Sequence, residues 1–140
     1  MKIVPLIAAV VALAGQSSGA PIAGSWTALF NGRTFVRLEL KAAKGTFDGG
    51  ISLGDVEVDQ QGALNRVSEA PRDLTPIFDV MQAASTVRFS RKDGADTDRF
   101  ELRVLETGRA ELQFLVSDRD FRELAAIGVP APRPFQLTKQ

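Results

Sequence analysis

Three carboxylates stand two residues apart and are the first residues whose type and spacing suit chemistry. Asp55, Glu57 and Asp59 alternate with Val56 and Val58, so the acids share one face of a predicted strand. Such a row offers oxygen ligands to Ca²⁺, or a carboxylate pair for glycoside hydrolysis. If Val56 and Val58 instead point into the core, the three acids lie on the solvated outer face of the strand. We favour the outer face, because it provides no cleft for catalysis.

The residue types that the chain lacks restrict its chemistry further. The sequence contains no His, no Cys and no Tyr. These absences exclude histidine general bases, thiolate nucleophiles, disulfides and zinc sites built on His or Cys. None of the serines fits Ser-x-x-Lys. We therefore expect a protein that is not an enzyme, has no cofactor, and has no metal ligands beyond the three weak candidates above.

Other charged residues also fit ordinary roles. Asp93, Asp96 and Asp98 surround Gly94 and are read as a polar loop, because the spacing of a calcium loop is absent. The chain has 17 basic and 17 acidic residues. This balance argues against a nucleic acid or an anionic membrane surface as partner.

Aromatic side chains supply most of the area for either a core or a ligand cavity. The six candidates are Trp26, Phe30, Phe47, Phe89, Phe100 and Phe114. Core packing is the simpler interpretation, because small eight-stranded barrels are often filled by side chains. Lining of a cavity is the alternative.

The first twenty residues have the layout of a secretory signal peptide. Lys2 precedes an uncharged apolar run over residues 3–14, and small residues follow to Ala20. Cleavage is expected after Ala14, with residues 19 and 20 as alternatives. The run is too short to span a bilayer, and the absence of Cys excludes lipidation at this signal. We expect a monomeric domain over 21–140, exported to the periplasm or the medium.

The elements that must position these side chains are mostly short strands. Alternating apolar residues recur between turn signals such as Asn31-Gly32 and Thr107-Gly108. Gly49-Gly50 predicts a bulge or a barrel corner. The pattern predicts a mainly β fold, an antiparallel up-and-down meander of 8–9 strands in a closed or nearly closed barrel. A two-sheet sandwich is the alternative.

Two short helices are expected to interrupt the meander. Leu74, Ile77, Phe78 and Met81 have the spacing of one helical face, which predicts a helix over 76–83 with Thr75 as N-cap. A second helix is predicted over 118–127, with Ser117 as N-cap and Gly128 after its end. Its apolar residues Phe121, Leu124 and Ala125 should face the core.

The start of the first strand resembles a known family. Gly24-Ser25-Trp26 is similar to the Gly-x-Trp signature of lipocalins and the wider calycin group, and the Pro134-to-Lys139 end resembles small secreted bacterial barrels. The resemblance implies that Trp26 plugs one barrel end and that the mouth binds a small apolar ligand. A helix over 76–83 would then act as a lid. A protein-interaction or inhibitor module of the periplasm is the alternative function.

Overall fold

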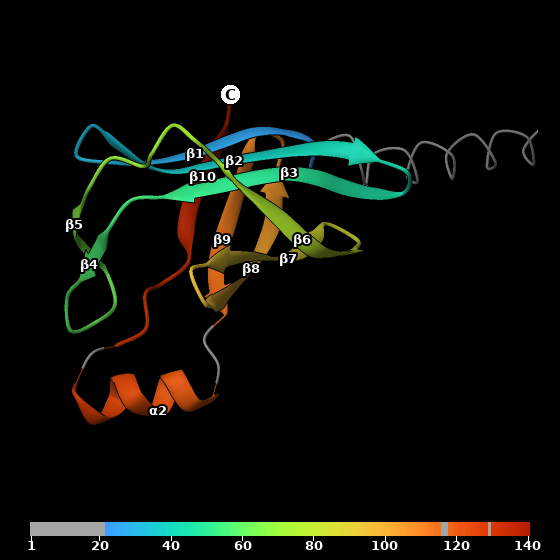
Figure 1. The fold of residues 1–140 in the computed structure, drawn as a ribbon. Coiled ribbons are helices and arrows are strands. Elements are labelled where there is room, and N and C mark those ends of the chain that lie inside the picture. The colour runs from blue at the N-terminus through green and yellow to red at the C-terminus, as the bar shows by residue number, and fades with distance from the viewer. Residues whose placement is uncertain (1–21, 116–117, 129) are drawn as a thin grey trace, which may run out of the picture.

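The fold is mainly β, and the computed structural model describes residues 22–115, 118–128 and 130–140. Its barrel strands are β1 (Gly24–Phe30), β2 (Arg33–Ala43), β3 (Thr46–Leu53), β6 (Thr75–Ala83), β7 (Thr86–Asp93), β8 (Asp96–Glu106), β9 (Arg109–Leu115) and β10 (Phe135–Lys139). They close in the order β1-β10-β9-β8-β7-β6-β3-β2 (Figure 1), and each pairing is antiparallel. The predicted up-and-down barrel is confirmed.

One hairpin leaves the barrel between β3 and β6. β4 (Val56–Val58) and β5 (Leu64–Val67) form a separate two-stranded sheet beside it (Figure 1). Alternation alone could not distinguish this hairpin from two further barrel strands, because both bury every second residue.

Two-residue turns join the consecutive barrel strands, except between β3 and β6 and between β9 and β10. Asn31 and Gly32 have φ angles of 51° and 79°, the left-handed pair that a two-residue hairpin turn requires. Lys44 and Gly45 repeat this conformation with φ angles of 43° and 81°. The predicted turn at Asn31-Gly32 is therefore confirmed.

The prediction of a helix over 76–83 is wrong, because this segment lies within strand β6. β6 pairs with β7, and the register shifts by one residue between Phe78 and Met81, where Asp79 has a φ of 52°. The bulge inverts the alternation, so that Ile77 and Val80, three residues apart, both pack against the core. The bulge therefore gives a strand the three-residue spacing of apolar side chains that is typical of a helix. Pairing with β7 determines that the segment is a strand, although its apolar spacing predicted a helix.

Gly49 has a role other than the predicted bulge. The register between β2 and β3 is unbroken from Val36–Leu53 to Ala43–Thr46. Gly49 has a φ of 143°, and a Cβ atom there would collide with the carbonyl oxygen of Glu39. Glycine is needed here because the β2 backbone approaches so closely.

The second predicted helix is present as α2 (Asp118–Ala126). Gly128, with a φ of 75°, follows its end, and its N–H donates to the carbonyl of Ala125 at 3.2 Å. Leu124 is half-buried and Ala125 is exposed, so the prediction that Ala125 faces the core is wrong. Ser117 and the side chain of Phe121 lie outside the described residues.

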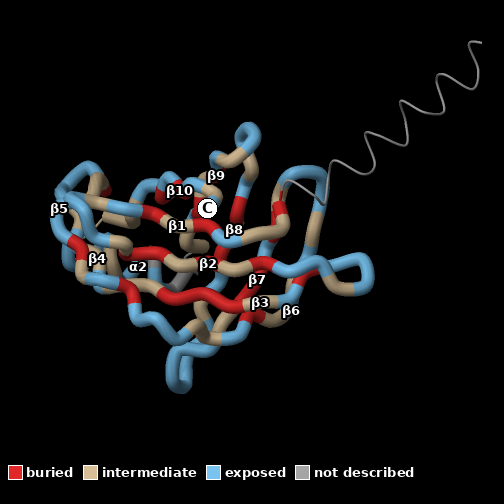
Figure 2. Tube along the Cα trace, turned by 90° about the horizontal axis from the view of Figure 1, so that it is seen from above, coloured by how far each residue is buried: buried red, intermediate tan, exposed pale blue. Residues whose placement is uncertain are grey.

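Buried residues are concentrated on the barrel strands (Figure 2). Phe89 stacks on Phe100 with ring centroids 5.4 Å apart, and Phe100 meets Phe114 edge to face at 5.2 Å. Phe35 and Phe135 make a second edge-to-face pair at 5.2 Å. These aromatic pairs join β7, β8 and β9 on one side of the barrel, and β2 and β10 on the other.

Charged pairs connect the strands on the outer face. Glu111 accepts hydrogen bonds from Arg103 at 2.6 Å and from Gln136 at 3.0 Å, which links β8, β9 and β10. These two bonds, the one from Arg103 first, hold the pKa of Glu111 below its ordinary value of 4.5. Their stabilising effect is present above the unfolded-state pKa and is lost as the pH falls through the lowered value.

Trp26 closes the core at its own end of the barrel. Its side chain is fully buried, and its Nε1 donates to the carbonyl of Ile22 at 2.8 Å. The Lys139 ammonium lies 5.7 Å from the centre of the Trp26 ring. The segment before β1 and the end of β10 therefore meet at this residue.

Replacing Trp26 should test this closure. We expect Trp26→Ala to lower the free energy of unfolding by about 3–5 kcal/mol through cavity formation. Trp26→Phe should cost about 1–3 kcal/mol, because the buried Ile22 carbonyl loses its donor. Urea denaturation measures both. Leu29→Ala is the control on the same strand, where Leu29 is 59% exposed, and it should change stability by less than about 0.5 kcal/mol. A Trp26→Phe variant as stable as this control would contradict the role of the hydrogen bond.

Candidate functional site

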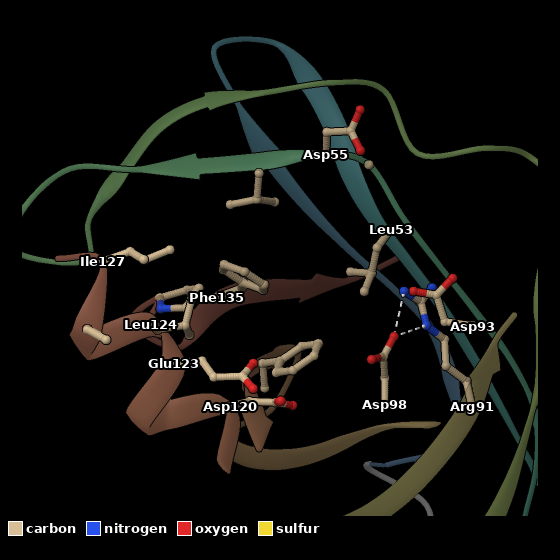
Figure 3. Close-up of a pocket in the computed structure, with 15 residues that line it drawn as sticks. Leu53, Asp55, Arg91, Asp93, Asp98, Asp120, Glu123, Leu124, Ile127 and Phe135 are labelled. Carbon is tan, nitrogen blue, oxygen red and sulfur yellow. Dashed lines mark hydrogen bonds and ion pairs between the residues drawn. The ribbon is translucent and has the colours of Figure 1, made fainter. Parts of the chain in front are cut away.

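A cavity of about 1040 Å³ lies between one end of the barrel and α2 (Figure 3). We call this end the barrel mouth and define it by Leu53 of β3, Phe114 of β9 and Phe135 of β10, which line the cavity. On β1, Trp26 lies four residues before Phe30 and so about 13 Å along the strand. Because Phe30 lies beside Phe135 in a neighbouring groove, Trp26 is on the side of the barrel away from the mouth.

Apolar side chains face the cavity from two sides. Leu53, Phe114 and Phe135 form its floor, and Leu124 and Ile127 face it from α2 and the turn that follows. Ile127 is 73% exposed, so most of its apolar surface is open to contact. The space between barrel and helix therefore offers apolar contact to a bound molecule on opposite walls.

An ion pair lies at the wall of the mouth. The Asp98 carboxylate accepts a hydrogen bond from Nε of Arg91 at 3.1 Å, and an Nη atom of Arg91 forms an ion pair with the same oxygen at 3.1 Å; the two side chains are only 15% and 16% exposed. The Arg91 guanidinium also lies 5.7 Å from the centre of the Phe100 ring. Charged groups this well shielded from water interact more strongly than pairs on the outer surface.

Strand alternation explains why this pair points inward. Phe89 and Phe100 are opposite each other in the register of β7 and β8, and Arg91 and Asp98 are the next opposed pair on the same face. On the inner face of β7 and β8, the side chains thus change from aromatic to charged within two residues. The packed core ends at this point, on the side of the barrel mouth.

The cover of the cavity is held by backbone hydrogen bonds. The Gly54 N–H donates to the Phe35 carbonyl at 2.8 Å, which anchors the start of the β4–β5 hairpin to β2. At the hairpin tip, Arg133 donates from its N–H to Gly62 at 3.0 Å and from Nε to Gln61 at 3.0 Å. The connection from α2 to β10 is thereby fixed to the hairpin, beside the mouth.

The predicted row of three acids does not form one site. Asp55 is an exposed residue at the rim of the cavity, and Glu57 forms an ion pair with Arg66 at 3.4 Å. Asp59 accepts from the N–H groups of Gln61 at 2.8 Å and Ala63 at 3.0 Å, so it stabilises the β4–β5 turn. Within the described ranges, no group of three or more acids is placed to hold a metal ion.

The polar loop predicted around Gly94 is shorter than expected. β7 extends to Asp93 and β8 starts at Asp96, so only Gly94 and Ala95 lie between the strands. Asp93 and Asp98 both line the cavity. The prediction that Asp98 belongs to a loop is wrong, because pairing with Arg91 continues the ladder to this residue.

The six aromatic candidates are divided between core and cavity. Trp26, Phe47, Phe89 and Phe100 are buried in the core. Phe114 lines the cavity, and Phe30 lines a smaller adjacent groove of about 360 Å³.

Sequence reasoning missed several lining residues: Leu53, Arg91, Leu124, Ile127 and Phe135. A signal existed for Arg91, because it follows the inward Val87 and Phe89 at the same two-residue spacing.

Comparison with protein-family models, with curated proteins and with solved structures gives no significant match. In the part of the chain that the structure describes, none of the helices is long and apolar enough to cross a membrane. The eight-stranded closed barrel is compatible with a calycin-like fold.

Two ion pairs on the same two strands allow a matched measurement. We expect a double-mutant cycle on Arg91 and Asp98 to give a coupling free energy of about 1–3 kcal/mol, because both groups are shielded. Arg88 and Glu101 are the control pair, at 2.8 Å with side chains 65% and 21% exposed. Their coupling should stay below about 1 kcal/mol and fall with added salt. Equal coupling in the two cycles, measured by urea denaturation of alanine variants, would contradict the shielding of the inner pair.

Proposed function

We propose that this protein is a non-enzymatic binding protein that holds a small apolar molecule in the barrel mouth, beneath α2. The observation that carries the proposal is the cavity of about 1040 Å³ with apolar side chains on opposite walls. Pockets for small ligands typically measure about 300–1,000 Å³ and are mostly apolar with a few placed polar groups. The Arg91–Asp98 pair supplies such polar groups at the wall.

The composition of the lining supports binding rather than covalent chemistry. The described lining residues include no Ser, Thr or Lys, so carboxylates are the available nucleophiles or bases. One of them, Asp98, is engaged by Arg91. Burial of apolar area on Phe114, Phe135 and Leu124 is the interaction that this cavity is best equipped to make.

The calycin-like arrangement of the barrel is a second support. Trp26 follows Gly24 on β1 and is buried away from the mouth, and the strands close in sequence order apart from the β4–β5 hairpin. In this proposal α2, rather than the segment 76–83, has the role of lid.

A neutral fluorescent naphthylamine, N-phenyl-1-naphthylamine, tests the proposal. We expect saturable binding at one site, with enhanced and blue-shifted emission. Ala126→Trp should lower the affinity at least about tenfold by filling the cavity that Ala126 lines. Ala125→Trp is the matched control. Ala125 is the residue next to Ala126 on α2, is exposed, and does not line the cavity. No saturable binding, or equal loss in both variants, would overturn the proposal.

We also propose that the chain is exported and that its leader is removed. Lys2, the apolar run over 3–14 and the small residues after it support this. Intact mass spectrometry of protein from the periplasm or medium of its own host should show a chain that starts at Gly15. A chain that retains Met1 and stays in the cytoplasm would contradict export.

A further inference from the structure

We propose that the ligand of this cavity has a neutral head group that both donates and accepts hydrogen bonds, such as a primary amide, at one end of an apolar body. The inference rests on the proposed function and adds the chemistry of the ligand's polar group to it. It is carried by the hydrogen-bonding capacity that the Arg91–Asp98 pair leaves unused at the cavity wall.

The contact between Arg91 and Asp98 uses one side of each group. Nε and Nη2 of Arg91 both lie 3.1 Å from Oδ2 of Asp98. With the described residues, Nη1 of Arg91 and Oδ1 of Asp98 form no hydrogen bond and no ion pair. The pair therefore retains N–H donors on one side chain and a carboxylate acceptor on the other.

A molecule in the cavity can reach these two atoms. Among the described residues, no buried side-chain nitrogen or oxygen atom lacks a hydrogen-bond partner. Because Nη1 of Arg91 and Oδ1 of Asp98 have no partner, they are accessible to solvent, although their side chains are largely shielded. Both residues line the cavity. A donor and an acceptor thus lie beside each other at its wall.

The pair favours a neutral head group because its two charges compensate each other. A carboxylate or phosphate would be attracted by Arg91 and repelled by Asp98, and an ammonium group would meet the reverse. A neutral amide gains from both side chains. Its carbonyl oxygen can accept from Arg91 while its N–H donates to Asp98.

A head group without both functions is at a disadvantage. When a ligand fills the cavity it displaces water from Nη1 of Arg91 and Oδ1 of Asp98. An ester or a tertiary amide offers an acceptor but no donor, so Asp98 loses its water without a replacement. Leaving a charged group unsatisfied in this way is unfavourable. We therefore expect the donor of the head group to determine the order of affinity among ligands with similar apolar bodies.

The position of the pair agrees with a ligand that is polar at one end. In Figure 3 the Arg91–Asp98 contact lies on one side of the cavity, below Leu53, and Leu124 and Phe135 lie on the other side. A head group at the ion pair would leave an apolar body to cover these side chains. The burial of that body supplies affinity, and the head group supplies selectivity.

Four probes with an eight-carbon chain test this selectivity by isothermal titration calorimetry: octanamide, N,N-dimethyloctanamide, octanoate and octylammonium. Octanamide should bind at least about tenfold more tightly than each of the other three. N,N-dimethyloctanamide keeps the carbonyl group, lacks the N–H donor and has the larger apolar surface. Apolar burial alone would therefore favour it over octanamide, which is the opposite of the order expected here.

A double variant tests whether the ion pair causes this order. Arg91→Met with Asp98→Leu replaces both charged groups together, so that neither remains unpaired. It should lower the affinity for octanamide about tenfold and should not weaken that for N,N-dimethyloctanamide, whose retained binding shows that the cavity is intact. Arg88→Met with Glu101→Leu is the matched control. This pair lies on the same two strands, is more exposed and does not line the cavity, so neither affinity should change.

Asp98→Asn tests the compensation of charge. This variant keeps the size of the side chain and removes the charge that balances Arg91. Octanoate should then bind about tenfold more tightly than it binds the unaltered protein, and added salt should reduce the gain. Asp73→Asn is the control, because Asp73 is an exposed acid that does not line the cavity. An octanoate affinity that Asp98→Asn leaves unchanged would contradict the compensation.

The outcomes distinguish this inference from the proposed function. Equal affinity for octanamide and N,N-dimethyloctanamide, or tightest binding of a charged probe, would overturn the neutral donor-and-acceptor head group and retain a binding cavity. An amide preference that persists in the double variant would also overturn it. If the neutral naphthylamine binds and octanamide does not, this inference fails alone. If none of these molecules binds, the proposed function fails as well.

Discussion

The sheet must close on itself between its first and last strands, and this closure determines the rest of the structure. β1 and β10 pair through Trp26–Lys139 and Thr27–Thr138, and the Gln140 N–H donates to the Ser25 carbonyl at 2.8 Å. After α2 the chain returns to the barrel, where β10 begins at Phe135, a residue of the mouth. Pro130, Pro132 and Pro134 favour an extended path for this return, and Arg133 fixes it to the β4–β5 hairpin. The segment that leads into the closing strand thus also lies beside the cavity, which Pro132 and Phe135 line.

The interior of the barrel changes in character along two neighbouring strands. Val87 opposes Leu102, Phe89 opposes Phe100, and Arg91 opposes Asp98 in the register of β7 and β8. The first two pairs are buried core, whereas the third lines the cavity. Since every second residue of a barrel strand faces inward, a single change of residue type is enough to end the core and begin the lining of the cavity. The stability of the barrel and the polarity of the site are therefore set by consecutive residues of one face.

Local patterns predicted the strands of this protein better than they predicted its site. Turn residues such as Asn31-Gly32 and the alternation on β2 and β8 depend on neighbours in sequence, so the sequence was sufficient for them. β6 was misread because its bulge at Asp79 is stabilised by pairing with β7. The cavity was missed because it brings together Leu53, Phe114 and Leu124, which come from three distant elements. The inward direction of Arg91 and Asp98 is the part of the site that the sequence could have predicted. It follows from extending the alternation of inward residues along β7 and β8 by one more pair.

The two ends of the barrel are closed by different means. Near Trp26, β3 and β6 share a short ladder of two residue pairs, Gly50–Pro76 and Ile51–Thr75. Pro76 lacks an N–H, and Asp48 accepts from the Gly49 N–H at 2.9 Å, so both strand edges discourage further pairing. Buried side chains, Trp26 and Phe47, close that end instead. At the mouth no comparable aromatic plug is needed, because α2 and the hairpin cover the space without filling it. Packing thus seals one end, whereas α2 and the hairpin cover a cavity at the other end.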